Sequence, residues 1–326
     1  MLTDKSEQEL RSYTSAQTRP ADFDAFWDAT LEQARAAGAD TPVAVRRAEE
    51  AGLTAVEVYD VEFPGFAGDP VRAWLRVPAG TEGPLPTVVQ FVGYGGGRGL
   101  AWDNLFWAAS GFAHLHMDTR GQGSGWSRGW TADPHGTAGP SAPGVMTRGV
   151  RGKETYYYRR LMTDAVRAVD AVAQLPHTDP QRIAVVGESQ GGGLAIAAAG
   201  LSEKVRAVAA SVPFLCDFPR GTTITDSYPY KEVADYLAVH RDETESVAEV
   251  LSYFDGVNLG SRAQAPAYFS AALMDPIVPP STVFGAYHAY AGPKRIQVWP
   301  YNGHEGGGAE EWVRVRAFLA EQFAAA

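Results

Sequence analysis

The stretch that decides the fold is RIAVVGESQGGGLAIAAAGL at residues 182–201. It joins a continuously apolar strand to a helix of small residues through GESQG at 187–191, a G-x-S-x-G sequence. Small residues around a serine allow a sharp turn from strand to helix that leaves the hydroxyl exposed. A glycine-rich turn without chemistry is the alternative. The strand before the motif and the helix after it favour Ser189 as a nucleophile.

Further short apolar runs lie on both sides of this stretch. They are TVVQFVG (87–93), FAHLHMD (112–118), VRAVAASVP (205–213), APAYFSAAL (265–273) and RIQVWPY (295–301). Runs without alternation are typical of strands buried on both faces of a parallel sheet. Helical spacing at 156–175, 194–201, 281–290 and 310–323 completes the βαβ pattern. The sequence therefore predicts an α/β fold with a mostly parallel central sheet and helices on both faces.

Four segments lie outside this alternation. Two alternating runs at 53–63 and 71–78 predict an antiparallel hairpin before the parallel strands. A Gly/Pro/Trp-rich segment at 122–153 predicts a long ordered loop, and short helical patterns at 214–262 predict an inserted cap or an oligomer contact. We expect one domain over 1–326, in which 1–40 form an N-terminal helical extension.

Composition excludes several classes of function. The formal net charge of −10 opposes binding to nucleic acid or to an anionic membrane surface, so a small molecule is the expected partner. No apolar run is long enough to cross a membrane, and the start has no secretory pattern. The single Cys216 fits a reducing compartment, although a lone cysteine would also be tolerated outside the cell. Cys/His clusters and a dinucleotide fingerprint are missing. We therefore expect no metal and no cofactor, and a dehydrogenase is excluded.

A serine nucleophile needs a histidine base that is oriented by a carboxylate. In chain order the acid follows the serine and the histidine follows the acid. Asp275 in LMDPIVPPST and His304 in YNGHEGGG both come just after a predicted strand, where site residues collect. The alternative for Asp275 is a turn or a helix cap. The other candidate histidines lie in helical segments or ahead of the serine: His240, His288, His114 and His116.

Two backbone donors are expected to face the oxyanion of the intermediate. One is the N–H of Gln190, which follows the nucleophile, and the other is the N–H of Tyr94 in GYGGG at 93–97. A phosphate-binding loop is excluded there because no Lys-Ser/Thr follows. The expected walls of the acyl pocket are residues beside these loops: Tyr94, Pro213, Phe214 and Ile277.

Several longer motifs occur in a fixed order along the chain. They are TRPADFDAFW (18–27), GYGGGRG (93–99), DTRGQGSGW (118–126), GESQGGG (187–193), MDPIVPPST (274–282) and YNGHEGGG (301–308). Together they resemble the acetyl xylan esterase and cephalosporin C deacetylase family of carbohydrate esterases, which has the α/β-hydrolase fold.

The resemblance implies the same site: Ser189, Asp275 and His304 as the catalytic residues, with the N–H groups of Tyr94 and Gln190 as the oxyanion hole. It also implies a cytoplasmic, metal-free enzyme that deacetylates short xylo-oligosaccharides and cephalosporin C and forms a homo-hexamer. The alternatives are a general short-chain carboxylesterase or a peptidase of the same fold. From another class, a catalytically silent binding scaffold is disfavoured by the intact triad.

The chain departs from the family pattern at two positions. Val278 stands where many members carry cysteine, and Glu188 stands where a small residue is usual. Glu188 is expected to be solvated; the alternative is a charge close enough to stabilise protonated His304. Arg120, Gln122 and Glu305 are expected to be structural, with the arginine bridging to Glu305 so that His304 is held in place.

Overall fold

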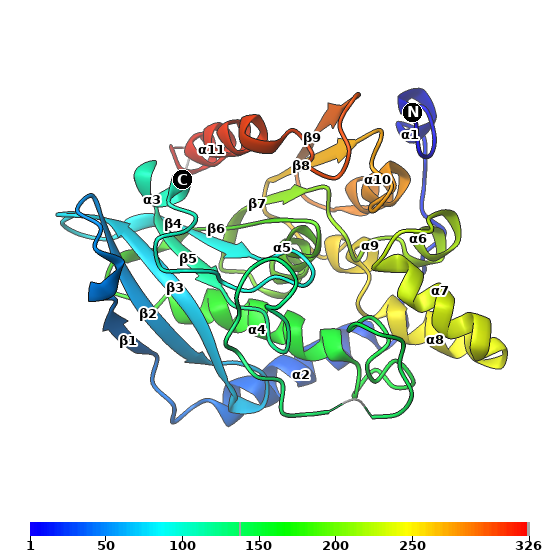
Figure 1. The fold of residues 1–326 in the computed structure, drawn as a ribbon, viewed down its shortest axis with the longest axis horizontal. Helices are drawn as coiled ribbons and strands as arrows, with labels where there is room; N and C mark the ends of the chain where they lie inside the picture. The colour runs from blue at the N-terminus through cyan, green and yellow to red at the C-terminus, as the bar shows by residue number, and fades with distance from the viewer. Residues whose placement is uncertain (137, 325–326) are drawn as a thin grey trace.

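The computed structural model describes residues 1–136 and 138–324, and a nine-stranded sheet runs through its centre (Figure 1). The strand order is β1-β2-β3-β5-β4-β6-β7-β8-β9. The pairs from β5 onward are parallel, whereas β1 to β3 and the β3–β5 pair are antiparallel. The strands are β1 (Ala44–Arg47), β2 (Val56–Pro64), β3 (Pro70–Pro78), β4 (Leu85–Phe91), β5 (Ala113–Met117), β6 (Thr178–Glu188), β7 (Val205–Ser211), β8 (Ala267–Ala272) and β9 (Lys294–Trp299).

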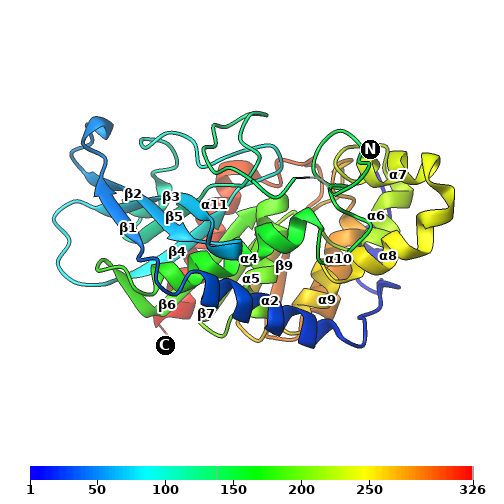
Figure 2. The same ribbon diagram turned by 90° about the horizontal axis from the view of Figure 1, so that it is seen from below.

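Helices cover both faces of this sheet. In Figures 1 and 2, α3 and α11 lie on one face and α2, α4 and α5 lie on the other. The α-helices are α1 (Glu7–Leu10), α2 (Phe23–Ala37), α3 (Phe106–Ala109), α4 (Tyr157–Val172), α5 (Gln190–Leu201), α6 (Phe218–Ile224), α7 (Tyr230–Val239), α8 (Thr244–Ser252), α9 (Gly256–Gly260), α10 (Pro280–Ala289) and α11 (Gly308–Ala324). The predicted α/β architecture is confirmed.

The predicted hairpin is also confirmed, because β2 and β3 pair antiparallel over their full length, from Val56 opposite Pro78 to Pro64 opposite Pro70. The sequence pattern missed α1 and β1. All four residues of β1 are exposed, so this edge strand has no apolar alternation to reveal it. The first helix, α1, has only four residues and is held by a capping box between Ser6 and Glu9.

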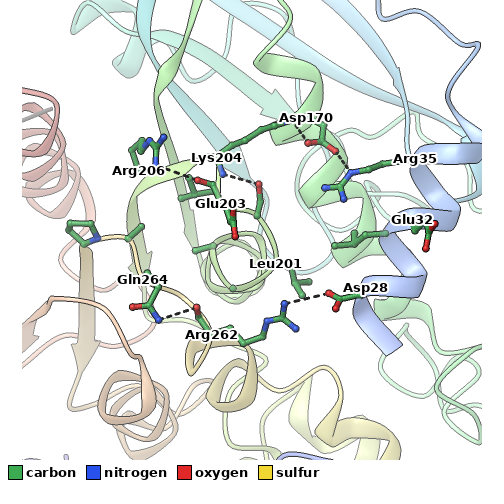
Figure 3. Close-up of a pocket in the computed structure, with 17 residues that line it drawn as sticks. Asp28, Glu32, Arg35, Asp170, Leu201, Glu203, Lys204, Arg206, Arg262 and Gln264 are labelled. Atoms are coloured by element: carbon green, nitrogen blue, oxygen red, sulfur yellow. Dashed lines mark hydrogen bonds and ion pairs between the residues drawn. The ribbon is translucent and has the colours of Figure 1, made fainter. Parts of the chain in front are cut away.

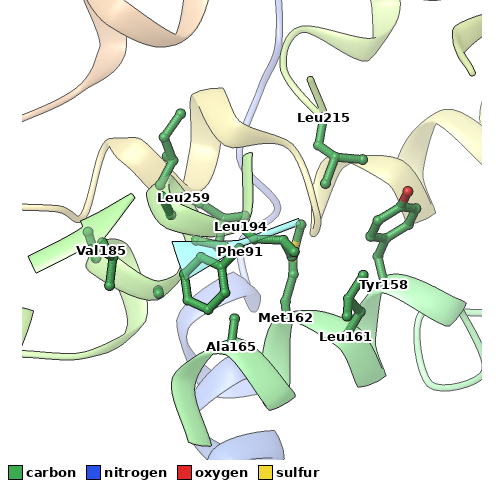
Figure 4. Packing of buried hydrophobic residues seen from close by; sticks show 14 of the residues in the cluster. Phe91, Tyr158, Leu161, Met162, Ala165, Val185, Leu194, Leu215 and Leu259 are labelled. Atoms are coloured by element: carbon green, nitrogen blue, oxygen red, sulfur yellow. The ribbon is translucent and has the colours of Figure 1, made fainter. Parts of the chain in front are cut away.

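The main core lies between the sheet and the helices α4 and α5 (Figure 4). Phe91 of β4 and Val185 of β6 pack there against Leu161, Met162 and Leu194, all buried. α5 is buried along its whole length, which explains its composition of glycine, alanine and leucine. A Cβ at Gly193 would lie 2.2 Å from the carbonyl oxygen of Phe214, so larger residues would push α5 off the sheet. This close packing fixes the position of the residue at the start of α5.

The segment predicted as a helical insertion, 214–262, contains α6 to α9. In Figures 1 and 2, α6, α7 and α8 lie at the end of the molecule opposite β1 and β2, whereas α9 lies further inward. The predicted long loop lies between β5 and α4, and its residue 137 is outside the described residues. No helix in the described ranges is both long and apolar enough to cross a lipid bilayer.

Candidate active site

Ser189 stands at the turn between β6 and α5, and its backbone is strained. Its φ of 55° and ψ of −121° are values that non-glycine residues rarely adopt. A Cβ at Gly187 would lie 2.2 Å from the carbonyl carbon of Gly191, and a Cβ at Gly191 would lie 2.2 Å from the carbonyl oxygen of Phe91. Neither glycine position has room for a side chain. The chain therefore turns sharply enough to present the serine at the carboxyl end of the sheet.

Asp275 and His304 lie side by side at the same edge, just after β8 and β9. Nδ1 of His304 is 2.8 Å from Oδ2 of Asp275. Asp275 is fully buried, and its Oδ1 accepts hydrogen bonds from the backbone N–H groups of Ile277 (2.8 Å) and Val278 (3.0 Å). These bonds fix the carboxylate and orient the imidazole. Nε2 is the ring nitrogen that remains for a second partner.

Ser189 and His304 line one cavity of about 530 Å³. The serine is 7% exposed, which leaves its side chain within reach of a bound molecule. The structure therefore brings the predicted nucleophile, base and acid to one place, although they come from three separate loops.

Two of the four expected pocket walls, Tyr94 and Ile277, line this cavity. Phe214 is fully buried beside the Tyr94 ring, with ring centroids 6.3 Å apart. Pro213 packs against the backbone of Gly192. Neither Pro213 nor Phe214 is among the residues that line the cavity.

The expected oxyanion donors lie in two loops that are joined by Gln122. Its Oε1 accepts the N–H of Gly95 (2.6 Å), and its Nε2 donates to Oε1 of Gln190 (2.9 Å). Gln190 in turn donates from Nε2 to the carbonyl of Val92 (3.1 Å). In the described chain no hydrogen bond uses the backbone N–H of Tyr94 or of Gln190, so both are available to a ligand. Gln122 is thus a positioning residue for the glycine-rich loop.

The expectation that Arg120 bridges to Glu305 is wrong. Arg120 is fully buried and donates from Nε and Nη2 to Asp164, and from Nη1 to Asp69 (3.0 Å). Glu305 is exposed and accepts from Asn302 (2.9 Å). The reason is that Asp164 on the buried helix α4 requires a partner, whereas Glu305 is already solvated. Arg120 therefore holds the loop after β5 to α4 rather than to the His304 loop.

The expectation that Glu188 is solvated is also wrong, because this residue is half-buried and lines the cavity with His304. Burial raises the pKa of Glu188 to about 7, although the nearby His304 opposes this. Burial also disfavours protonated His304. The Asp275 hydrogen bond and the charges of Asp275, Glu188 and Glu305 outweigh it, so the pKa of His304 is raised.

Replacing Glu188 with glutamine is expected to move the acidic limb of the kcat/KM profile to lower pH by a fraction of a unit, because Glu188 with its pKa of about 7 is only partly ionised near neutral pH. The substitution removes a negative charge that favours imidazolium, so the pKa of His304 falls and the neutral base persists in more acidic solution. The measurement is the pH dependence of p-nitrophenyl acetate hydrolysis. Glu305→Gln is the control: that carboxylate is exposed and its charge is screened, so a smaller shift is expected. Equal profiles for wild type and Glu188→Gln would exclude the effect.

Several residues that line the cavity were not predicted from the sequence, among them Gln90, His116 and Trp126. His116 precedes Ser189 in the chain, which disfavours it as the catalytic base but does not prevent it from lining the cavity. The alternation in His114-Leu115-His116 was the available signal, since it places both imidazoles on one face of β5. Trp126 is 68% exposed and donates from Nε1 to the carbonyl of Tyr94 (2.8 Å), so it lies against the glycine-rich loop.

A larger cavity, about 1010 Å³, lies away from this site, among α2, the ends of α4 and α5, and the start of β7 (Figure 3). Several of its charged side chains form ion pairs: Asp170 binds Arg35 and Lys204, and Arg262 binds Asp28. Its walls carry ion pairs rather than a nucleophile beside a base, so we do not assign chemistry to it. Over 1–136 and 138–324, no group of three or more metal-ligating side chains is placed to hold an ion.

The strand order and the serine at a strained turn between strand and helix define an α/β-hydrolase. Comparison with known proteins specifies the family. The family model for acetyl xylan esterase (AXE1) matches residues 1–322. The chain therefore belongs to the acetyl xylan esterase family, whose members are carboxylic ester hydrolases.

Two solved structures are similar over nearly the whole chain. The acetyl xylan esterase from Paenibacillus sp. R4 is 37% identical, with a TM-score of 0.89, 97% of this chain covered and 99% of that chain. Acetyl xylan esterase 1 from Thermoanaerobacterium sp. JW/SL YS485 is 33% identical, with a TM-score of 0.88 and coverage of 98% and 99%.

A longer relative is the acetyl esterase Axe7A of Xylanibacter ruminicola, 28% identical over 305 residues. The match covers 92% of this chain and 66% of that protein, so the chain spans just under two thirds of its length. A prolyl endopeptidase structure, 21% identical with a TM-score of 0.60, covers 82% of this chain and 37% of its own. At that distance it shares the fold alone.

Proposed function

We propose that this protein is a serine esterase that removes acetyl groups from acetylated xylo-oligosaccharides. Ser189 is the nucleophile, His304 the general base and Asp275 the residue that orients it. The observation that carries the proposal is the 2.8 Å contact between His304 and Asp275, beside a serine at a strained turn in the same cavity. The names of the family and of its similar structures support acetyl xylan as the substrate class.

The reaction follows from the positions of these groups. Oγ of Ser189 attacks the acetyl carbonyl while Nε2 of His304 takes the hydroxyl proton. Two backbone N–H groups, those of Tyr94 and Gln190, bind the oxyanion. The tetrahedral intermediate collapses as His304 returns the proton to the sugar oxygen, which leaves as an alcohol. Water, deprotonated by His304, then attacks the acetyl-serine ester, and acetate leaves with Ser189 restored.

Asp275 keeps its charge through this cycle. Its bond to Nδ1 holds the ring in the tautomer that has Nε2 free to accept a proton, and it stabilises the imidazolium that forms. Because its other oxygen is held by two backbone N–H groups, the carboxylate cannot rotate away when His304 becomes charged.

The test is acetate release from acetylated xylo-oligosaccharides, together with rates on p-nitrophenyl esters of increasing length. Tyr94 and Ile277 line the cavity together with Ser189 and leave little room for a long acyl chain in this proposal, so we expect kcat/KM to fall by about tenfold or more from acetate to butyrate. Equal rates on acetate and octanoate would indicate a lipase-like esterase. Cleavage of aminoacyl p-nitroanilides in preference to esters would indicate a peptidase.

Three further features belong to this proposal and rest on the family resemblance: activity on the acetyl ester of cephalosporin C, a homo-hexameric assembly and a cytoplasmic location. The lone Cys216 is fully buried, and burial raises the pKa of its thiol well above the usual value. A thiol in that state is inert, which agrees with a reducing compartment but does not require one. Light scattering tests the assembly.

A further inference from the structure

The cavity beside Ser189 has two chemically different walls. One is largely apolar and contains Tyr94, Ile277, Pro229 and Tyr228. The other combines polar groups with two indole rings: Gln90, Asn104, His116, Ser127, Trp126 and Trp312. Glu188, Ser189 and His304 line the same cavity. We call these the apolar wall and the polar wall.

Strand alternation explains where the polar wall lies. Gln90 of β4 is directly opposite His116 of β5. Val88 and Val186 share their sheet face with Gln90, and both belong to the apolar cluster under α3 and α11. Trp312 of α11 packs edge-on against Trp107 of α3, with ring centroids 5.8 Å apart. Gln90, His116 and Trp312 therefore lie at the outer end of the layer between the sheet and these two helices. Trp126 and Ser127 come from the loop after β5, which is bonded to the glycine-rich loop.

The apolar wall belongs to a different part of the molecule. The Tyr94 hydroxyl donates to Glu232 of α7 (2.6 Å), which ties this ring to the insertion that carries Tyr228 and Pro229. The hydroxyl of Thr225, in the same insertion, donates to the carbonyl of Pro276 beside Ile277. Apart from Trp126, which donates to the carbonyl of Tyr94, the two walls are thus built by separate elements.

His116 contributes a nearly buried imidazole to the polar wall. The residue is only 3% exposed, and in the described chain its Nδ1 has no hydrogen-bond partner. Burial lowers the pKa of His116 to about 3, and the charges of Arg76 and Arg98 act in the same direction. The imidazole is therefore neutral at physiological pH.

We propose that the polar wall binds the sugar ring of the leaving alcohol, while the acetyl methyl group faces the apolar wall. This inference rests on the proposed function. It assigns the sugar side of the ester to one wall and the acetyl side to the other. A cavity of about 530 Å³ is large enough for a whole small ligand, well beyond an acetyl group. Neutral amide, hydroxyl and imidazole groups suit the hydroxyls of an uncharged sugar, and indole faces suit its C–H surfaces. Glu188 would disfavour acidic sugars.

The test compares two acetate esters that share the acyl group: acetylated xylobiose and ethyl acetate. In Gln90→Leu, the ratio of kcat/KM for the sugar ester to kcat/KM for ethyl acetate is expected to fall about tenfold, mainly through KM for the sugar ester. Gln297→Leu is the matched control. It is also a half-buried strand glutamine, on β9, but it does not line the cavity, so its ratio should equal that of wild type.

Asn104→Gly provides a second variant in case Gln90→Leu folds poorly. Asn104 has a φ of 52°, which glycine adopts readily, so the change removes the side chain without straining the loop. It is expected to lower the same ratio. An unchanged ratio in both folded variants would overturn the assignment, as would a Gln90→Leu enzyme that changes its preference between acetate and butyrate instead. A wild-type enzyme active on ethyl acetate but not on acetylated xylobiose would contradict the proposed function itself.

Discussion

Ser189→Ala is expected to lower kcat for p-nitrophenyl acetate by roughly four to six orders of magnitude. Without the hydroxyl no acetyl-enzyme forms, and only binding and the two backbone donors remain to assist attack by water. The fold is expected to persist. Alanine meets the same backbone strain at φ 55° as serine does, and the Oγ of Ser189 makes no hydrogen bond to another described residue.

Initial rates and thermal unfolding measured on the same preparation separate chemistry from folding. Ser202→Ala, at the opposite end of α5, is the control and should retain wild-type activity. A Ser189→Ala enzyme that keeps a tenth or more of the wild-type kcat would show that another group attacks the ester.

Arg120→Ala is expected to destabilise the protein by about 3–5 kcal/mol. The substitution leaves the carboxylate of Asp164 fully buried without its bidentate partner, and also releases Asp69. Burial already raises the pKa of Asp164 even with the arginine present. Once Arg120 is removed, the pKa in the folded state rises further above its unfolded value. The folded variant then binds more protons than the unfolded chain, so its stability should decrease as pH rises.

Urea denaturation at pH 5 and pH 8 measures this effect, with a larger loss expected at pH 8. Adding Asp164→Asn to Arg120→Ala should recover part of the stability, because it removes the unpaired charge. Arg182→Ala is the control: it breaks a partly exposed pair with Asp179 and should cost less than about 1 kcal/mol. An Arg120→Ala protein with wild-type unfolding and abolished turnover would instead assign the arginine to catalysis.

The catalytic candidates could be predicted because each is marked by local sequence. Ser189 lies between a buried strand and a small-residue helix, and Asp275 and His304 each follow an apolar run of strand length. The carboxyl ends of parallel strands meet at one edge of the sheet, so residues just after such strands converge. Local pattern and topology together sufficed for these three.

The partners of buried charges could not be predicted in the same way. Arg120 binds Asp164, which is 44 positions away in the sequence. In the sequence pattern Asp164 cannot be distinguished from the exposed polar residues of an amphipathic helix. Only the packing of α4 under the sheet makes that carboxylate inaccessible to water. Glu188 is a similar case, because its burial depends on which side chains surround the end of β6. Long-range packing, rather than local preference, decides both.

The common role of the residues in the polar wall could not be predicted from the sequence either. His116 and Gln90 belong to strands that read as continuously apolar runs, and each has an ordinary structural explanation in isolation. Their common role depends on the β4–β5 register, which pairs the two residues. It also depends on the packing of α11, which comes from the far end of the chain, against α3. Neither the register nor that contact is visible in sequence spacing.

In the proposed reaction Ser189 attacks the substrate, and His304 activates the serine hydroxyl. Treatment with a fluorophosphonate, followed by peptide mass spectrometry, tests this directly because such reagents phosphonylate an activated serine. We predict a single adduct on the peptide containing Ser189, complete loss of esterase activity in step with labelling, and much slower labelling in His304→Ala. Inactivation with the adduct on another residue, or full labelling of the His304→Ala enzyme at the wild-type rate, would contradict the claim.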